Sequence, residues 1–331
     1  MALTTTMAKL RAVLFGATGL AGQQFVSALK AHPFFELAAV AASPRNAGRR
    51  YGEALAEGGW FLAEPIPEAV ASLPLLEAAK VEASDFELAF SAVEADVARE
   101  LEPRLARLIP VFSTASAFRY DADVPLLLPP VNASHLPLVR VQRARGFAGY
   151  VAPIPNCTAT GLVVALAPLV ERFGVQAVLM TSLQAVSGAG RSPGVAALDV
   201  LDNVIPFIPK EEGKVEAEAR KILGRWASGQ PSVDAHPMRL SATCTRVAVL
   251  GGTPRRCPSR WDGRQASRKC APRCATGGAR PRRATCLPAR LGGLRCWMPS
   301  TGRSRGSTAR RTAGWRPASA GCARTPSCPT A

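Results

Sequence analysis

The sequence predicts an α/β protein with a doubly wound parallel sheet in its N-terminal half, a second α+β domain, and a C-terminal tail that is disordered or poorly packed. Three observations predict this organisation. An apolar run, a glycine-rich turn and an apolar-periodic segment follow one another from Leu10, in the order strand, turn, helix. Longer alternating runs begin at Val175, and the composition changes abruptly after Gly252. We therefore expect domains at residues 1–156 and 157–252 and a tail at 253–331.

Charge and cysteine are concentrated in the predicted tail. The chain of 331 residues has a formal net charge of +17. Residues 253–331 hold 17 arginines and one lysine against one aspartate, whereas residues 1–252 hold 23 basic and 23 acidic side chains. The tail also holds seven of the nine cysteines and lacks Val, Ile, Phe, Tyr and His, so it cannot build a core.

The first strand-to-helix junction has the pattern of a dinucleotide site. Leu10–Phe15 reads as a buried strand, and GATGLAG follows it directly. Its three glycines permit a tight turn and a close approach to a pyrophosphate, whose charge the helix N-terminus meets. An ordinary glycine turn is the alternative. The pattern predicts a Rossmann-type domain whose cofactor contacts Gly16, Ala17, Thr18, Gly19, Leu20, Ala21 and Gly22.

The next strand indicates which dinucleotide is bound. Phe35–Ala42 leads into ASPRNAGRR, without the acidic residue that would hold a ribose 2′-hydroxyl. Ser43 and Arg45 could hold a 2′-phosphate, which favours NADP over NAD; a solvated basic loop is the alternative. Further elements of the parallel sheet are expected as strands at Leu88–Ser91 and Val111–Ser113 and an amphipathic helix at Asp96–Leu108.

One cysteine has the setting of a nucleophile. Cys157 lies in PIPNCTATG, between a proline-rich approach and small residues that can begin a helix. A helix N-terminus lowers the pKa of a thiol, so a thiolate nucleophile is expected there near neutral pH. An inert core cysteine is the alternative. Upstream, the guanidinium of Arg119 could hold a phosphate or an oxyanion, the alternative being a surface arginine.

The second half carries a family resemblance. VQAVLMTSLQAV and LSATCTRVAVL read as strands, and between them lie SGAGRSPGV, LDVLDNVIPFIPKEEGKV and a polar helix, VEAEARKILG. Together with GATGLAG and PNCTATG, these segments resemble aspartate-semialdehyde dehydrogenases of the archaeal and fungal type, in order from about Arg11 to Gly252. That family converts aspartyl phosphate reversibly to aspartate semialdehyde with NADP, through a cysteine thioester, in lysine, threonine and methionine biosynthesis.

The resemblance implies a role for each matching residue. Cys157 would be the nucleophile and Gln184 would orient the acyl group. The expected substrate contacts are Asn156 and Arg119 for phosphate, Glu211 and Glu212 for the ammonium group, Lys214 for phosphate and Arg246 for the carboxylate. A solvated charge run is the alternative for the two acids and the lysine. The further cofactor contacts would be Ser113, Ser187, Gly188 and Gly190.

The sequence departs from the family where a base is expected. The family has histidine seven residues after the carboxylate-binding arginine, in RVxVxxGHTE, and this position is Thr253 here. His32, His135 and His236 read as structural or surface residues. Restoring one C before the codons of TPRRCPSRWDG permits HTEAVSVAMG, which is similar to the family's continuation. The sequence therefore suggests a coding frame shifted after Gly252, and low activity for this polypeptide.

Other functions follow from the same motifs. N-acetyl-glutamyl-phosphate reductase and malonyl-CoA reductase share the two-domain plan and the thioester, but the paired acids near Lys214 favour a substrate with an amino group. A non-catalytic NADP-binding remnant with a nucleic-acid-binding tail is the non-enzyme alternative. The tail arginines lack periodicity and aromatic interleaving, which argues against a nucleic-acid partner.

Location, metal content and assembly are also expected from the sequence. The chain has no apolar stretch of membrane-spanning length and no signal-peptide pattern, and the body has only two cysteines, Cys157 and Cys244. These features predict a cytoplasmic protein without a membrane partner. Cys270 and Cys274 have no second pair, so no metal site is predicted. The resemblance implies a homodimer or homotetramer acting on a small-molecule substrate.

Overall fold

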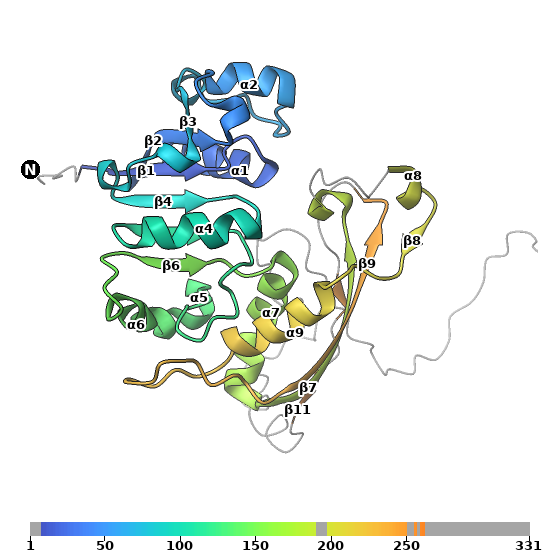
Figure 1. Ribbon diagram of the computed structural model, residues 1–331. Helices are drawn as coiled ribbons and strands as arrows, with labels where there is room; N and C mark the ends of the chain where they lie inside the picture. The colour runs from blue at the N-terminus through green and yellow to red at the C-terminus, as the bar shows by residue number, and fades with distance from the viewer. Residues whose placement is uncertain (1–7, 190–196, 250–254, 257–258, 262–331) are drawn as a thin grey trace, which may run out of the picture. The chain divides into compact units, whose positions relative to one another are not determined.

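The computed structural model describes residues 8–189, 197–249, 255–256 and 259–261, which form two β-sheets with helices packed on them (Figure 1). Thr253, Gly190, and the tail cysteines Cys270 and Cys274 lie outside the described residues. Among the helices of the described residues, none combines the length and the apolar composition of a membrane span.

Six parallel strands form the first sheet, in the spatial order β3-β2-β1-β4-β5-β6. The strands are β1 (Leu10–Phe15), β2 (Phe35–Ala42), β3 (Leu75–Glu77), β4 (Leu88–Ser91), β5 (Pro110–Ser113) and β6 (Tyr150–Pro153). The order reverses between β1 and β4, which is where doubly wound sheets bind ligands, at the carboxyl ends of their strands. The predicted Rossmann-type parallel sheet is confirmed.

Helices cover both faces of this sheet. Leu14 belongs to one core cluster, together with Val26 and Val40, whereas its neighbours Val13 and Phe15 belong to a second cluster on the other face. Successive residues of a strand point to opposite faces, so a strand buried on both faces reads as the continuous apolar run seen here. The helices are α1 (Leu20–Leu29), α2 (Tyr51–Gly58), α3 (Glu68–Ala71), α4 (Ala95–Ala106), α5 (Pro129–Asn132) and α6 (Val139–Arg143).

The second sheet is mixed. β7 (Val175–Gln184) and β9 (Arg239–Val247) run parallel, β8 (Val204–Ile205) joins β9 antiparallel, and β10 (Arg255–Arg256) and β11 (Ser259–Trp261) join β7 antiparallel. The helices are α7 (Cys157–Phe173), α8 (Ala197–Val200) and α9 (Glu211–Ile222). Residues of α7, α9, β7 and β9 share one buried core, so α7 and α9 cover one face of this sheet (Figure 1).

The opposite face of β7 is exposed and partly apolar. Buried and exposed residues alternate along most of the strand, and Leu179 and Leu183 are 64% and 41% exposed. A strand with one covered face shows this period of two.

β10 and β11 lie beyond residue 252, where the sequence predicts the end of the second domain. Both pair with β7 through backbone hydrogen bonds, which any residue except proline can supply at such a position. The domain boundaries stay predictions.

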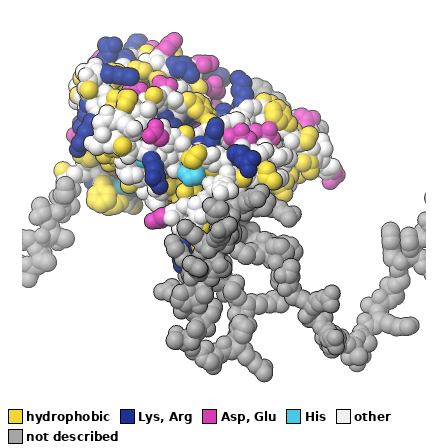
Figure 2. Space-filling view, turned by 90° about the horizontal axis from the view of Figure 1, so that it is seen from below, with side chains coloured by type: hydrophobic (Ala, Val, Ile, Leu, Met, Phe, Trp, Pro, Cys, Tyr) yellow, Lys and Arg dark blue, Asp and Glu magenta, His cyan; other side chains and the backbone are white. Residues whose placement is uncertain are grey.

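The surface of the described residues is mixed in charge. On the face drawn in Figure 2, Lys and Arg side chains lie interspersed with Asp and Glu side chains. Such mixing matches the equal numbers of basic and acidic residues in residues 1–252, 23 of each.

Candidate active site

The glycine turn after β1 fits a dinucleotide pyrophosphate. Gly16 has φ +74°, and a Cβ atom there would collide with the backbone carbonyl of Ala92, which follows β4. A Cβ atom on Gly22 would collide with the carbonyl oxygen of Gly16 and lie 2.7 Å from the Cα of Ala17. Gly19 caps α1 without any side-chain hydrogen bond to the first turn. The turn thus has room only for glycine at two points and leaves helix N–H groups for an anion.

The remaining predicted cofactor residues that the structure describes lie at three places in the chain, after β2, at the end of β5 and after β7. Ser43 and Arg45 are exposed and follow the carboxyl end of β2, next to β1 in the sheet. Ser187 and Gly188 lie in the 3₁₀ turn Val186–Ala189 after β7. Ser113 is buried at the end of β5, where its hydroxyl donates to Glu102 Oε1 at 2.5 Å and accepts from the backbone N–H of Ala115. Its side chain is thus already engaged within the domain.

Cys157 is the first residue of α7, as the sequence predicts. Asn156 is the N-cap, and its Oδ1 accepts from the backbone N–H groups of Thr158 at 2.8 Å and Ala159 at 3.1 Å. Pro153 ends β6, so a strand of the first sheet leads into this cap. Cys157 is exposed, whereas Cys244 of β9 is buried and its pKa is raised by burial. Exposure at a helix N-terminus is the setting of a reactive thiol rather than of a core cysteine.

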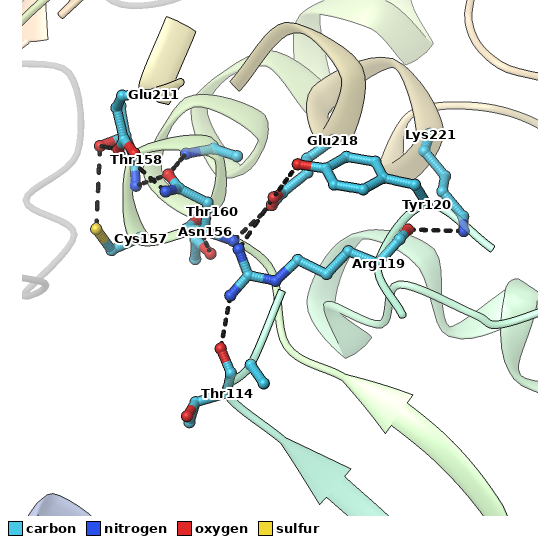
Figure 3. Close-up of polar contacts among 12 residues, drawn as sticks. Thr114, Arg119, Tyr120, Asn156, Cys157, Thr158, Thr160, Glu211, Glu218 and Lys221 are labelled. Atoms are coloured by element: carbon cyan, nitrogen blue, oxygen red, sulfur yellow. Dashed lines mark hydrogen bonds and ion pairs between the residues drawn. The ribbon is translucent and has the colours of Figure 1, made fainter. Parts of the chain in front are cut away.

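Glu211 gathers the polar groups around the cysteine. Its side chain is 8% exposed, and its Oε1 accepts from Asn156 Nδ2 at 3.0 Å, Gln184 Nε2 at 3.1 Å and Thr158 Oγ1 at 3.4 Å (Figure 3). These donors come from the start of α7 and the end of β7. The Glu211 carboxylate therefore connects two other predicted site residues, Asn156 and Gln184, with Thr158, which the sequence did not suggest.

Arg246 lies beside Gln184 because the two residues are paired in the parallel register of β7 and β9. It is buried, and its Nη1 donates to the carbonyl of Ala185 at 2.8 Å. Glu212 accepts from the backbone N–H of Cys244 at 3.0 Å. Lys214 is half-buried in the first turn of α9. The end of β7, the end of β9 and the start of α9 thus converge here.

Arg119 reaches this region by way of an acid that the sequence did not single out. Its Nη1 donates to Glu218 Oε1 at 3.0 Å, and its Nη2 donates to the carbonyl of Thr114 at 2.8 Å. Both side chains are buried, and Arg119 Nε has no partner among the described residues. Glu218 lies in the segment VEAEARKILG, which the sequence indicates only as a polar helix. Lys221 lies three residues later in the same segment. Only this spacing, which places both side chains on one helix face, could have suggested that they contact the same part of the chain.

The histidines lie elsewhere. His135 is buried, its Nδ1 is 3.1 Å from Asn132 Nδ2 and its Nε2 is 3.2 Å from the carbonyl of Gly224, and burial lowers its pKa. The ring of His32 stacks on Phe35 at the start of β2. Neither is connected to Glu211 by any hydrogen bond within the part of the chain that the structure describes.

Comparisons with known proteins identify the family of the chain. Residues 11–138 match the semialdehyde dehydrogenase NAD binding domain, and residues 166–256 match the semialdehyde dehydrogenase dimerisation domain. The aspartate-semialdehyde dehydrogenase of Methanothermobacter thermautotrophicus is 41% identical over 240 residues, which cover 72% of this chain and 67% of that protein. The Saccharomyces cerevisiae enzyme of the same name is 39% identical over 250 residues, covering 72% and 68%.

A solved structure gives the same result. The crystal structure of aspartate semialdehyde dehydrogenase with NADP from Candida albicans superposes with a TM-score of 0.70 at 37% identity, covering 77% of this chain and 72% of that one. With an NAD(P)-binding domain, a dimerisation domain and these relatives, the chain belongs to the aspartate-semialdehyde dehydrogenase family.

Proposed function

We propose that this chain binds NADP and forms a thioester between Cys157 and the acyl group of aspartyl phosphate, on the way to aspartate semialdehyde. The observation that carries this proposal is an exposed cysteine at the N-terminus of α7, beside the Glu211 carboxylate that Asn156 and Gln184 contact. The Candida albicans relative solved with NADP and the glycine turn after β1 support the choice of cofactor.

The proposed chemistry begins with attack by the thiolate of Cys157 on the acyl carbon. A C–S bond forms, the bond from carbon to the phosphate oxygen breaks, and the phosphate leaves with that electron pair. NADPH, when bound, supplies the hydride that reduces the acyl carbon. The sulfur then leaves as a thiolate when the C–S bond breaks, so Cys157 is regenerated.

The other side chains would bind and orient the substrate. Glu211 carries the negative charge that a substrate ammonium requires, and Arg246 offers a guanidinium to the substrate carboxylate. Gln184 is buried and held by Glu211 at 3.1 Å, which suits a residue that orients the acyl group. Arg119 and Lys214 would provide positive charge for phosphate. We assign Glu212 to the substrate ammonium group as well, in addition to the hydrogen bond that it accepts from the backbone of β9.

Acylation without cofactor tests the proposal. The full chain is incubated with aspartyl phosphate in the absence of NADPH, so that an acyl group cannot be reduced and remains on the enzyme. Mass spectrometry of peptides is expected to find it on Cys157, and Cys157→Ser to abolish it, whereas Cys244→Ser keeps it. Absence of the acyl group in the wild-type chain, or faster acylation by N-acetyl-glutamyl phosphate or malonyl-CoA, would contradict the proposal.

We further propose that turnover of this polypeptide is very low because Thr253 stands where the family has its histidine base. Supporting this, His135 is buried and paired away from Glu211. Insertion of one C before codon 253 is expected to restore the base and to raise turnover of aspartate semialdehyde, phosphate and NADP by at least about a hundredfold. Rapid turnover by the chain as given would refute this.

The proposed assembly is a cytoplasmic homodimer or homotetramer without nucleic acid. A dimerisation domain is present, and the exposed apolar face of β7 at Leu179 and Leu183 is suited to a second copy. We expect Leu179→Lys to shift the chain toward the monomer in light scattering. An unchanged mass would count against this face.

A further inference from the structure

Glu218 joins three segments that are far apart in the sequence. Its side chain is 0% exposed. Oε1 accepts from Arg119 Nη1 at 3.0 Å and Tyr120 Oη at 3.3 Å, and Oε2 accepts from the backbone N–H of Asn156 at 2.6 Å (Figure 3). One carboxylate on α9 therefore holds the loop after β5 with one oxygen and the N-cap of α7 with the other.

Lys221 strengthens this arrangement from the next turn of α9. Its Nζ donates to the carbonyl of Arg119 at 2.9 Å and to that of Asp121 at 2.7 Å. Glu218 and Lys221 are three residues apart and so share one face of the helix. The loop that carries Arg119 is thus held by its side chain and by its backbone.

The acid does not have the character of a substrate contact. Both of its oxygens accept hydrogen bonds from the protein, and its side chain is 0% exposed, so neither oxygen faces the surface from which a ligand would bind. A buried ion pair also adds little to the free energy of unfolding, because the cost of desolvating the two charges offsets their attraction. The contacts point to a geometric role, since Asn156 directly precedes Cys157 and caps its helix.

We propose that Glu218 is a positioning residue for acyl transfer, fixing the Asn156 backbone, and with it Cys157, in a set place relative to Arg119. The proposal rests on the function proposed above. When Glu218 is intact, the distance between the Cys157 thiol and the Arg119 guanidinium stays fixed. When the contacts of Glu218 with Arg119 and Asn156 are lost, both groups remain present, but the distance between them is no longer fixed.

Two variants separate geometry from charge. Glu218→Gln keeps the length of the side chain but removes the charge and one acceptor, whereas Glu218→Asp keeps the charge but is too short to bridge Asn156 and Arg119. Glu171→Gln is the matched control, because Glu171 is exposed near the other end of α7 and its replacement removes the same charge. All variants are made in the full chain.

The first readout is the rate of alkylation of Cys157 by iodoacetamide at pH 7.5, followed on its own peptide because the chain has nine cysteines. Removal of a negative charge would by electrostatics alone speed alkylation in Glu218→Gln. Loss of positioning weakens the helix N-terminal environment and is expected to slow alkylation about threefold in both Glu218 variants. The two explanations therefore predict opposite signs for Glu218→Gln.

The second readout is the rate of acylation by aspartyl phosphate, expected to fall at least about tenfold in both Glu218 variants because misplacement of reacting groups is costly. Glu171→Gln should match the wild type in both readouts. If Glu218→Gln does not fold, Glu218→Asp alone decides, since a charge-only role predicts wild-type rates for it. Wild-type or faster rates in folded Glu218 variants would overturn the proposal. Slower alkylation in a chain that aspartyl phosphate never acylates would instead uphold positioning and refute the proposed function.

Discussion

Replacement of Asn156 by alanine is expected to lower the free energy of unfolding by about 2–3 kcal/mol. The N-cap bonds to Thr158 and Ala159 account for about 1 kcal/mol of this loss. The bond from Asn156 Nδ2 to the Glu211 carboxylate at 3.0 Å accounts for a further loss of about 1–2 kcal/mol, because Glu211 is 8% exposed and would lose one of its hydrogen-bond donors while it keeps Gln184 and Thr158.

Asn156→Ser divides this loss into its two parts. Serine is a good N-cap but too short to reach Glu211, so this variant is expected to lose only about 1–2 kcal/mol. Urea unfolding followed by circular dichroism measures both variants at the same pH and salt. Equal losses for the two variants would show that the cap contributes nothing, and a loss below about 0.5 kcal/mol in Asn156→Ala would refute the reasoning about both contacts.

Three further predictions concern the cofactor turn, a buried acid and the second cysteine. Gly22→Ala is expected to weaken NADP binding at least about tenfold, measured by fluorescence titration, because the added methyl group would displace the backbone of Gly16. Burial raises the pKa of Glu102 above its ordinary value of 4.5, so the stability that its protonated form contributes is present below pH 4.5 and is lost as pH rises through the raised pKa. Glu102→Gln is therefore expected to gain stability relative to the wild type as pH increases from 4.5, in thermal unfolding. Cys244 is fully buried with a raised pKa, and iodoacetamide should alkylate it at least about a hundredfold more slowly than Cys157 in the folded chain.

Each of these predictions has a result that would contradict it. Gly58→Ala is the control for the cofactor turn, since a Cβ atom there meets no neighbouring atom within 4 Å, and equal NADP affinity in the two glycine variants would refute the steric argument. A constant difference in melting temperature between Glu102→Gln and the wild type across pH would show that Glu102 does not titrate. Comparable alkylation of both cysteines would mean that β9 opens readily.

The sequence predicts the elements of this fold where they are locally determined. Leu10–Phe15 and Phe35–Ala42 have the bounds expected, because a continuous apolar run between turn residues defines a buried strand. β3 and β6 were not predicted, although the equally short β4 and β5 were. β6 ends at Pro153, the first residue of the proline-rich segment before Cys157, and proline is a weak signal for a strand. The predicted helix at Asp96–Leu108 is α4, which begins one residue earlier and ends two residues earlier.

The candidate site was predictable only in part. Cys157 stands out because prolines precede it and small residues follow it, which is a local signal. Glu218 does not, because its partners Asn156 and Arg119 are 62 and 99 residues away and only tertiary packing brings them together. Glu102 was missed because the sequence does not distinguish a buried acid in an amphipathic helix from a solvent-exposed one.

Leu183 and Gln184 are consecutive residues of β7, and they project from opposite sides of it. The outer side carries the apolar surface at Leu179 and Leu183, and the inner side carries the amide that meets Glu211. Any sliding or twisting of this strand would move both sides at once. A molecule that covers the outer surface thus contacts the same strand that carries Gln184. A displacement of β7 caused on one side will therefore also move the residues on the other side.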